Sequence, residues 1–150
     1  MSNDLHTELE IHATPERVWE VLTDFESYPD WNPFIPKISG PIHVGARLDT
    51  RLQPPGGRGM RFRPTLLAAE PAKELRWLGH LIVPGIFDGE HRFRIEPLDQ
   101  ERVRFIQEER FTGILSRLVM RLIGEDTLRG FEAMNQALKL RAEQTTAAGR

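Results

Sequence analysis

The sequence predicts an α+β fold in which a curved antiparallel sheet packs against one long C-terminal helix. Two observations lead to this prediction. Apolar and polar residues alternate through 5–13 and through most of 34–112, as they do in strands that bury one face. From 114 to 142 the apolar residues instead recur every three or four positions, as along one side of a helix.

The first elements are a strand, a short helix and a helical turn. Alternation places one set of side chains on the inner face of the strand: Leu5, Thr7, Leu9, Ile11 and Ala13. Thr14 is a good N-cap and Pro15 suits the first helical position, so a helix is expected over 15–23. Residues 24–33 contain two prolines and several turn formers, which predicts a second short helical turn followed by a loop.

About six further strands are expected between 34 and 112, joined by short turns into an antiparallel meander. The cluster 54–59, with two prolines and three glycines, is the strongest turn signal in the chain, and a hairpin turn is expected at 98–101. A sheet with one apolar face needs a cover. The helix over 114–142 is the only long element with an apolar stripe, so we expect a hollow between it and the sheet.

Length and composition are those of one globular domain, here 1–150, with 143–150 expected to be a frayed tail. The chain has 150 residues, no cysteine and a formal net charge of −2. The lack of cysteine excludes disulfides and thiolate metal sites, and the charge argues against a strongly basic nucleic-acid binder. No apolar run is long enough to be an integral membrane segment, and the N-terminus lacks a signal-peptide pattern. We therefore expect a cytoplasmic protein.

Residues 11–34 carry the pattern A-x-P-E-x-V-W-x-V-L-x-D from Ala13 to Asp24, followed by Y-P-x-W-N-P-F from Tyr28 to Phe34. A second match covers 91–97 and 107–113. This sequence resembles the polyketide cyclase/dehydrase-like branch of the START/Bet v 1, or SRPBCC, superfamily. The resemblance implies the helix-grip fold: a curved seven-stranded antiparallel sheet wrapped around a long C-terminal helix, with two short helices after the first strand. It implies an apolar cavity but no single reaction, since the superfamily includes lipid carriers, hormone receptors and cyclases.

Polar residues fall in phase with the core positions of the last two strands. Alternation puts His91 with Phe93 on one strand, and Gln107 and Glu109 with Phe105 on the next. An ionisable group that faces an apolar interior is costly unless it is paired. Glu109 is therefore a candidate general acid or base with His91 as its partner. The alternatives are a buried structural pair, or a bulge that turns these groups outward.

Large aromatic residues complete the expected cavity. Trp31, Phe34 and Trp77 are expected to line it, with plain core packing as the alternative for Trp77. Asn32 either supplies a polar contact near the cavity mouth or caps a turn. The predicted ligand-binding residues are Trp31, Asn32, Phe34, Trp77, His91, Phe93, Phe105, Gln107 and Glu109.

The uncharged segment 81–87 spans a Pro-Gly turn, where a loop is usually polar. An apolar loop indicates a cavity portal, a lid or a subunit contact, with a buried hairpin end as the alternative. The predicted portal residues are Val83, Pro84, Ile86 and Phe87.

Arginines dominate the polar face of the strands. They are expected to pair with glutamates of neighbouring strands rather than to bind an anionic partner such as nucleic acid or a phospholipid surface. No cofactor is expected, because no phosphate-binding or dinucleotide-binding motif occurs. No metal site is expected at 88–91 either, because Glu90 and His91 point to opposite faces of a strand.

Three functions remain open at this point. The first is the binding of a small hydrophobic molecule, such as a lipid, an aromatic or a polyketide-like compound, between sheet and helix. The second is a cofactor-independent enzyme of the cyclase/dehydratase type. The third is a protein-interaction module with a vestigial cavity. A homodimer through an exposed apolar edge is compatible with each.

Overall fold

The computed structural model describes residues 4–81 and 83–148. Its first elements are strand β1 (Leu5–Ile11), helix α1 (Pro15–Thr23), the short 3-10 helix η1 (Phe25–Ser27) and helix α2 (Tyr28–Trp31). The side chain of Thr14 accepts a hydrogen bond from the N–H of Arg17 at 3.1 Å, which caps α1 as predicted. The strand, the helix and the following helical turn are thus confirmed.

Seven further strands follow: β2 (Lys37–Ser39), β3 (Asp49–Leu52), β4 (Met60–Phe62), β5 (Thr65–Glu70), β6 (Glu74–Leu81), β7 (Phe87–Asp99) and β8 (Arg102–Thr112). They pair antiparallel, in the order β1-β8-β7-β6-β5 in one sheet and β2-β3-β4 in another. The hairpin turn predicted at 98–101 joins β7 to β8.

The described residues therefore form eight strands in two sheets, where seven in one sheet were expected. Pro64 accounts for the difference, because it lies between β4 and β5 and has no N–H to donate to a ladder. The two sheets still join beside it. Leu66 exchanges backbone hydrogen bonds of 2.8 Å with Gly45 and Ala46, and the N–H of Leu48 donates to the carbonyl of Pro64.

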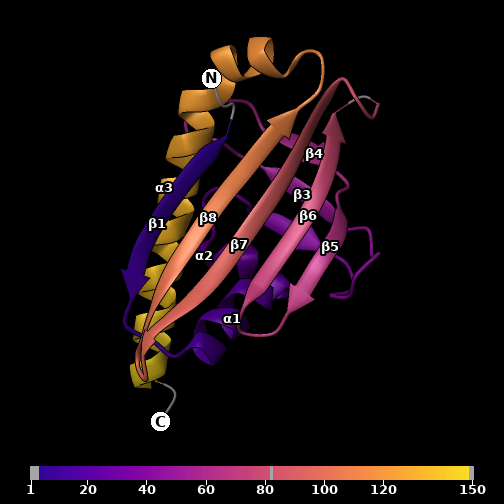
Figure 1. Ribbon diagram of the computed structural model, residues 1–150. Helices are drawn as coiled ribbons and strands as arrows, with labels where there is room; N and C mark the ends of the chain where they lie inside the picture. The colour runs from indigo at the N-terminus through magenta and orange to yellow at the C-terminus, as the bar shows by residue number, and fades with distance from the viewer. Residues whose placement is uncertain (1–3, 82, 149–150) are drawn as a thin grey trace.

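Helix α3 (Ser116–Ala148) runs along the five-stranded sheet beside β1 (Figure 1). The short helices α1 and α2 lie behind that sheet, with α1 toward the end where the β7–β8 hairpin turns. This arrangement confirms the α+β helix-grip fold. The α3 backbone is helical to Ala148, and fraying of 143–150 stays a prediction. None of the described helices has the length and apolarity needed to cross a bilayer.

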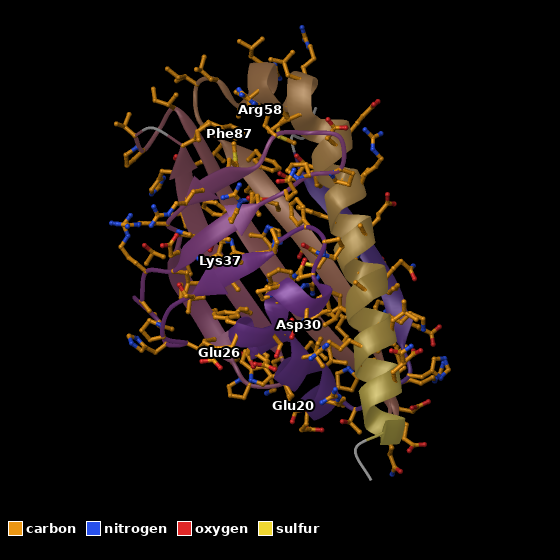
Figure 2. The ribbon with its side chains drawn as sticks, turned by 180° about the vertical axis from the view of Figure 1, so that it is seen from behind. Glu20, Glu26, Asp30, Lys37, Arg58 and Phe87 are labelled. Carbon is orange, nitrogen blue, oxygen red and sulfur yellow. The ribbon has the colours of Figure 1, made fainter. Side chains whose placement is uncertain are left out.

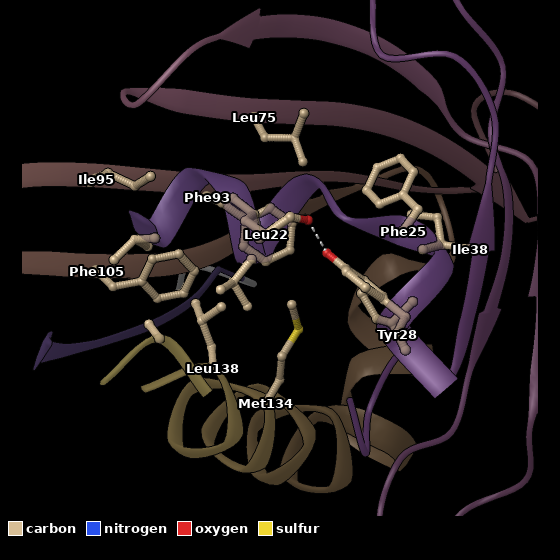
Figure 3. Close-up of a cluster of buried hydrophobic side chains, with 14 of the residues drawn as sticks. Leu22, Phe25, Tyr28, Ile38, Leu75, Phe93, Ile95, Phe105, Met134 and Leu138 are labelled. Atoms are coloured by element: carbon tan, nitrogen blue, oxygen red, sulfur yellow. Dashed lines mark hydrogen bonds between the residues drawn. The ribbon is translucent and has the colours of Figure 1, made fainter. Parts of the chain in front are cut away.

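The core fills the space between α3, the sheet and the short helices (Figure 3). The buried residues of α3 at its centre, Phe131, Met134 and Leu138, follow the predicted three- and four-residue spacing. Tyr28 is fully buried and its hydroxyl donates to the carbonyl of Leu22. Burial raises the pKa of the Tyr28 hydroxyl, which therefore stays a hydrogen-bond donor.

The outer face of the sheet is held by ion pairs between strands. Arg92 contacts Glu74 at 3.1 Å across the β6–β7 pair, and Arg94 contacts Glu108 at 3.2 Å across the β7–β8 pair. Arg102 of β8 contacts Glu10 of β1 at 2.6 Å. The predicted pairing of these strand arginines with glutamates is confirmed.

Candidate functional site

A cavity of about 240 Å³ lies between the sheet and the N-terminal half of α3. The small sheet and its 54–58 loop form one side, and the ends of β6, β7 and β8 form another. It lies at the end of the molecule that holds Arg58 and Phe87, opposite Glu20 on α1 (Figure 2). The lining residues are Phe34, Leu52, Pro54, Gly57, Arg58, Met60, Phe62, Gly79, His80, Leu81, Phe87, Gly89, Glu109, Phe111, Ile123, Asp126 and Thr127.

Most of the cavity wall is aliphatic or aromatic. The rings of Phe87 and Phe111 stack with their centres 5.4 Å apart. Gly79 of β6 leaves room for the ring of Phe62, which would lie 3.0 Å from a Cβ at that position. An apolar wall with a few polar groups is the usual composition of a small-molecule site.

Glu109 lines the cavity, and its carboxylate contacts the buried side chain of His91. Its side chain is 15% exposed, and Oε1 lies 3.1 Å from Nδ1 of His91. The other oxygen, Oε2, has no hydrogen-bond partner within the described part of the chain. It lies against Gly89, where a Cβ would approach it to 2.2 Å. Glycine at 89 therefore makes this position of the carboxylate possible.

His91 lies behind Glu109, away from the cavity, and its ring is enclosed by aromatic rings. The ring centres of Trp77, Phe93 and Phe131 are 5.3, 4.6 and 4.9 Å from that of His91. Both ring nitrogens have partners, because Nε2 lies 2.9 Å from Oε1 of Gln107. The aromatic rings and the two hydrogen-bond partners fix the position of the imidazole ring.

The hydrogen bonds continue inward from Gln107 to helix α3 and strand β1. Nε2 of Gln107 donates to Oδ1 of Asn135 at 2.7 Å and, at 3.4 Å, to the carbonyl of Phe131. Nδ2 of Asn135 donates to the hydroxyl of Thr7 at 2.8 Å. That hydroxyl donates to the backbone carbonyl of Gln107 at 2.9 Å. We call Glu109, His91, Gln107, Asn135 and Thr7 the buried polar chain.

The backbone carbonyl of Gln107, at the inner end of the buried polar chain, determines which group donates in each of its hydrogen bonds. A carbonyl only accepts, so the Thr7 hydroxyl must donate to Gln107 and accept from Asn135. The amide nitrogen of Asn135 is then used, and its oxygen faces Gln107. The oxygen of Gln107 consequently faces His91, which must carry a proton on Nε2.

These donor assignments leave one proton to be placed between His91 and Glu109, at the cavity wall. With Nε2 of His91 protonated, the contact between Nδ1 and Oε1 of Glu109 is a hydrogen bond only if one of these two atoms holds a proton. The pair is then either imidazolium with carboxylate or neutral imidazole with carboxylic acid. In both forms Oε2 of Glu109 can accept a hydrogen bond.

Three of the predicted residues lie on the cavity wall: Phe34, Phe87 and Glu109. His91 and Gln107 are buried behind Glu109. Trp77, Phe93 and Phe105 lie in the filled core, and Trp31 packs against that core outside the cavity. Oδ1 of Asn32 accepts from the N–H groups of Phe34 and Ile35 at 3.0 and 2.8 Å, so it caps a turn.

Of the other predicted portal residues, Val83 and Pro84 are exposed and Ile86 is half-buried, while Ile82 of the same segment lies outside the described residues. Their role in ligand entry stays a prediction. In the part of the chain that the structure describes, no three His, Asp or Glu side chains are grouped so that they could hold a metal ion.

The sequence reasoning missed Thr7 and Asn135 of the buried polar chain and Thr127 of the cavity wall. The helical spacing could have indicated two of them. Thr127 lies four residues before Phe131 and Asn135 four residues after it, so both fall on the apolar stripe of α3. Thr7 alternates with the inward residues of β1. A polar residue on an apolar face needs a buried partner. Searching both stripes for such residues would have found them.

The family described as "Polyketide cyclase / dehydrase and lipid transport" matches residues 3–143. A comparison with curated proteins found no match to the sequence.

Several solved structures share the fold at low sequence identity. The Zhui aromatase/cyclase from Streptomyces sp. R1128 has a TM-score of 0.70 and 20% identity over 95% of this chain and 94% of that one. A START superfamily protein from Mycobacterium smegmatis has a TM-score of 0.70 and 22% identity over 94% and 97% of the two chains. A norcoclaurine synthase point mutant from Thalictrum flavum has a TM-score of 0.71 and 13% identity over 97% of each.

Proposed function

Because this chain belongs to the family of polyketide cyclases, dehydrases and lipid transport proteins, we propose that it binds a small hydrophobic molecule in the cavity beside α3. The molecule carries a hydrogen-bond donor that reaches Oε2 of Glu109. The observation that supports this proposal is a mostly apolar cavity with a carboxylate oxygen that lacks a partner among the described residues.

The cavity volume indicates the size of the molecule. An apolar cavity of about 150 Å³ in another protein accepts benzene. The cavity here, at about 240 Å³, has room for a compound of about two fused rings. Phe62, Phe87 and Phe111 offer ring faces and edges to such a compound.

The polar end indicates the chemistry of the ligand. A carboxylate only accepts hydrogen bonds, so Glu109 favours a phenol, an enol or an amine over a simple hydrocarbon. A hydrogen bond to an ionised group is roughly twice as strong as one between neutral groups. The ligand is therefore expected to lie with its hydroxyl or amine at Glu109 and its rings toward Phe87.

The proposal is tested with naphthalene and 2-naphthol, which differ only in the hydroxyl. We expect isothermal titration to show that both bind and that 2-naphthol binds roughly tenfold tighter. Thr127→Met extends a side chain into the cavity and should weaken both compounds. Thr23→Met on α1 is the matched control, since Thr127 and Thr23 both donate to the carbonyl four residues earlier. Binding that Thr127→Met leaves unchanged would place the ligand elsewhere.

Native mass spectrometry of the freshly purified protein complements the titration. A reproducible extra mass that disappears on denaturing extraction would identify the class of the natural ligand. The cytoplasmic location and the homodimer stay predictions. An interaction module with a vestigial cavity has less support, because the cavity in the described residues has space for a ligand.

A second candidate function is a cofactor-independent enzyme of the cyclase/dehydratase type. The observation that favours it is the contact of 3.1 Å between Nδ1 of His91 and Oε1 of Glu109 at the cavity wall. In its carboxylate form Glu109 can take a proton from a carbon next to a ketone, which leaves an enolate and a carboxylic acid. The enolate carbon then takes a proton from solvent, and Glu109 returns its proton to solvent.

The ketone 2-tetralone, a two-ring compound, tests this candidate. In deuterated water we expect the protein to accelerate exchange of its α-hydrogens, followed by NMR, and Glu109→Gln to lose the acceleration. Glu108→Gln should keep it, since Glu108 lies on the outer face and pairs with Arg94. Exchange no faster than in buffer alone would rule out this chemistry for a ketone of that size.

A further inference from the structure

Exposed aliphatic side chains gather at the end of the molecule that holds the cavity. We call this cluster the apolar tip and define it as Val83, Ile114, Leu115, Leu118 and Leu122. The most exposed members are Ile114 at 80% and Leu122 at 75%. Figures 1 and 2 both show the first turns of α3 at the end of the molecule away from α1.

The fold holds the two segments of the apolar tip together. The N–H of Ile114 donates to the carbonyl of Gly85 at 3.0 Å, and the N–H of Leu115 donates to the carbonyl of Ile86 at 2.9 Å. Gly113 has φ +108, and a Cβ there would lie 2.5 Å from the oxygen of Ile86. Only glycine allows this approach easily. The aliphatic side chains are therefore presented outward by a defined backbone.

The apolar tip adjoins the cavity. Leu115 comes just before α3, and Leu118 and Leu122 follow it on the first turns of the helix at three- and four-residue steps, all of them exposed. The next residue, Ile123, lines the cavity, and so does Phe87, one position after Ile86. A surface that covered the apolar tip would lie beside the residues of the cavity wall.

Two arginines lie beside the apolar tip on α3. Arg117 and Arg121 lie on the same turns as its leucines, and the first acid of the helix is Glu125. Arg58, which lines the cavity, is at the same end (Figure 2). None of these three arginines has an ion-pair partner among the described residues, whereas Arg92 and Arg94 of the sheet do.

We propose that the apolar tip docks on the surface of an anionic lipid bilayer. The aliphatic side chains enter the boundary between headgroups and acyl chains, and the arginines contact lipid phosphates, as in an interfacial amphipathic helix. A second copy of this chain fits less well, because a twofold contact through the apolar tip would bring Arg117 and Arg121 against their own equivalents. Docking does not depend on what the cavity binds.

Sedimentation with lipid vesicles tests the proposal on the full chain. We expect binding to phosphatidylcholine vesicles that contain about 30% phosphatidylglycerol, much weaker binding to pure phosphatidylcholine, and a decrease with added salt. Arg117→Gln with Arg121→Gln should weaken binding about fivefold for each arginine. Leu118→Ser with Leu122→Ser should weaken it roughly tenfold or more.

Matched controls separate docking from general surface effects. Leu140→Ser removes a 58% exposed leucine from the other half of α3, and Arg51→Gln with Arg63→Gln removes two exposed arginines from the region of the small sheet. Both controls should bind vesicles like the unaltered protein, and all variants should keep its melting temperature. No binding to the anionic vesicles, or equal losses in the controls, would overturn the proposal. So would a dimer in sedimentation velocity that Leu118→Ser with Leu122→Ser dissolves, because the apolar tip would then be a contact between copies.

Discussion

Nδ1 of His91 lies 3.1 Å from Oε1 of Glu109, and this contact connects the cavity wall to hydrogen bonds that reach strand β1. Of these two residues, Glu109 lines the cavity, while His91 is buried behind it and contacts its carboxylate. The contact therefore gives an apolar cavity a polar end whose orientation is set from inside the protein.

Replacing Glu109 by Gln tests that polar end. The amide of Gln can still donate to Nδ1 of His91, so we expect a melting temperature close to that of the unaltered protein. The charge-assisted bond to a ligand hydroxyl is lost, and affinity for 2-naphthol should fall roughly tenfold while that for naphthalene is unchanged. Titration calorimetry measures both. Equal losses for the two compounds would mean that Glu109 shapes the cavity without contacting the hydroxyl.

Asn135→Leu removes the residue that orients Gln107. Nε2 of Gln107 then keeps only the 3.4 Å contact to the carbonyl of Phe131. We expect a loss of about 1–3 kcal/mol in the free energy of unfolding, which is typical for a buried donor without a good partner. Gln136→Leu, at an exposed position of the same helix, is the control and should cost little.

The same variant has a spectroscopic consequence. In the unaltered protein, ¹⁵N NMR should find a proton on Nε2 of His91. In Asn135→Leu the amide of Gln107 is free to turn and can donate to Nε2, so a second form of His91 with its proton on Nδ1 should appear. Protonation of Nδ1 alone in the unaltered protein would contradict the direction deduced for the buried polar chain.

We expect the replacement of Gly124 and of Gly130 in α3 by alanine to change the free energy of unfolding in opposite directions. Alanine normally stabilises a helix interior by about 1 kcal/mol relative to glycine. At 124 a Cβ meets only Cε of Met120, at 3.5 Å, so Gly124→Ala should stabilise the protein by up to about that amount. At 130 a Cβ would lie 2.3 Å from the ring of Phe34. Gly130→Ala should therefore destabilise the protein by about 1–3 kcal/mol. Urea unfolding of both variants decides the signs.

His6 on β1 makes the stability of the outer face depend on pH. The hydrogen bond to Glu108 raises the pKa of His6 above 6.5, burial opposes that rise, and Glu8 adds to it. Because the pKa is raised in the folded state, this stabilisation is fully present below pH 6.5 and is lost as the pH rises through the folded pKa. We expect His6→Gln to lower the melting temperature at about pH 5.5 and to have less effect at about pH 9. An equal effect at both pH values would rule out this ion pair as the cause.

Local pattern predicted most of the elements. The period of two in β1 and the Thr14–Pro15 start of α1 have local physical causes, namely pleating and helix capping. The same alternation predicted that His91 and Gln107 face inward with Phe93, and both are buried. Pro64 was present in the sequence, but the end of β4 and the start of β5 on either side of it depend on how the two sheets join.

The sequence by itself determined the fold class, the inward face of each strand and the apolar stripe of α3, because these follow from the periods of helix and strand. Only the tertiary structure decided where the cavity lies. Side chains fill one end of the hollow, where Phe93 and Phe105 meet Met134 and Leu138 (Figure 3). Gly79, Gly89 and Thr127 leave the other end open. Thr7 and Asn135 are 128 residues apart, and no period relates them. Their contact exists because packing brings β1 and α3 together, and packing depends on the volumes of side chains from all elements at once.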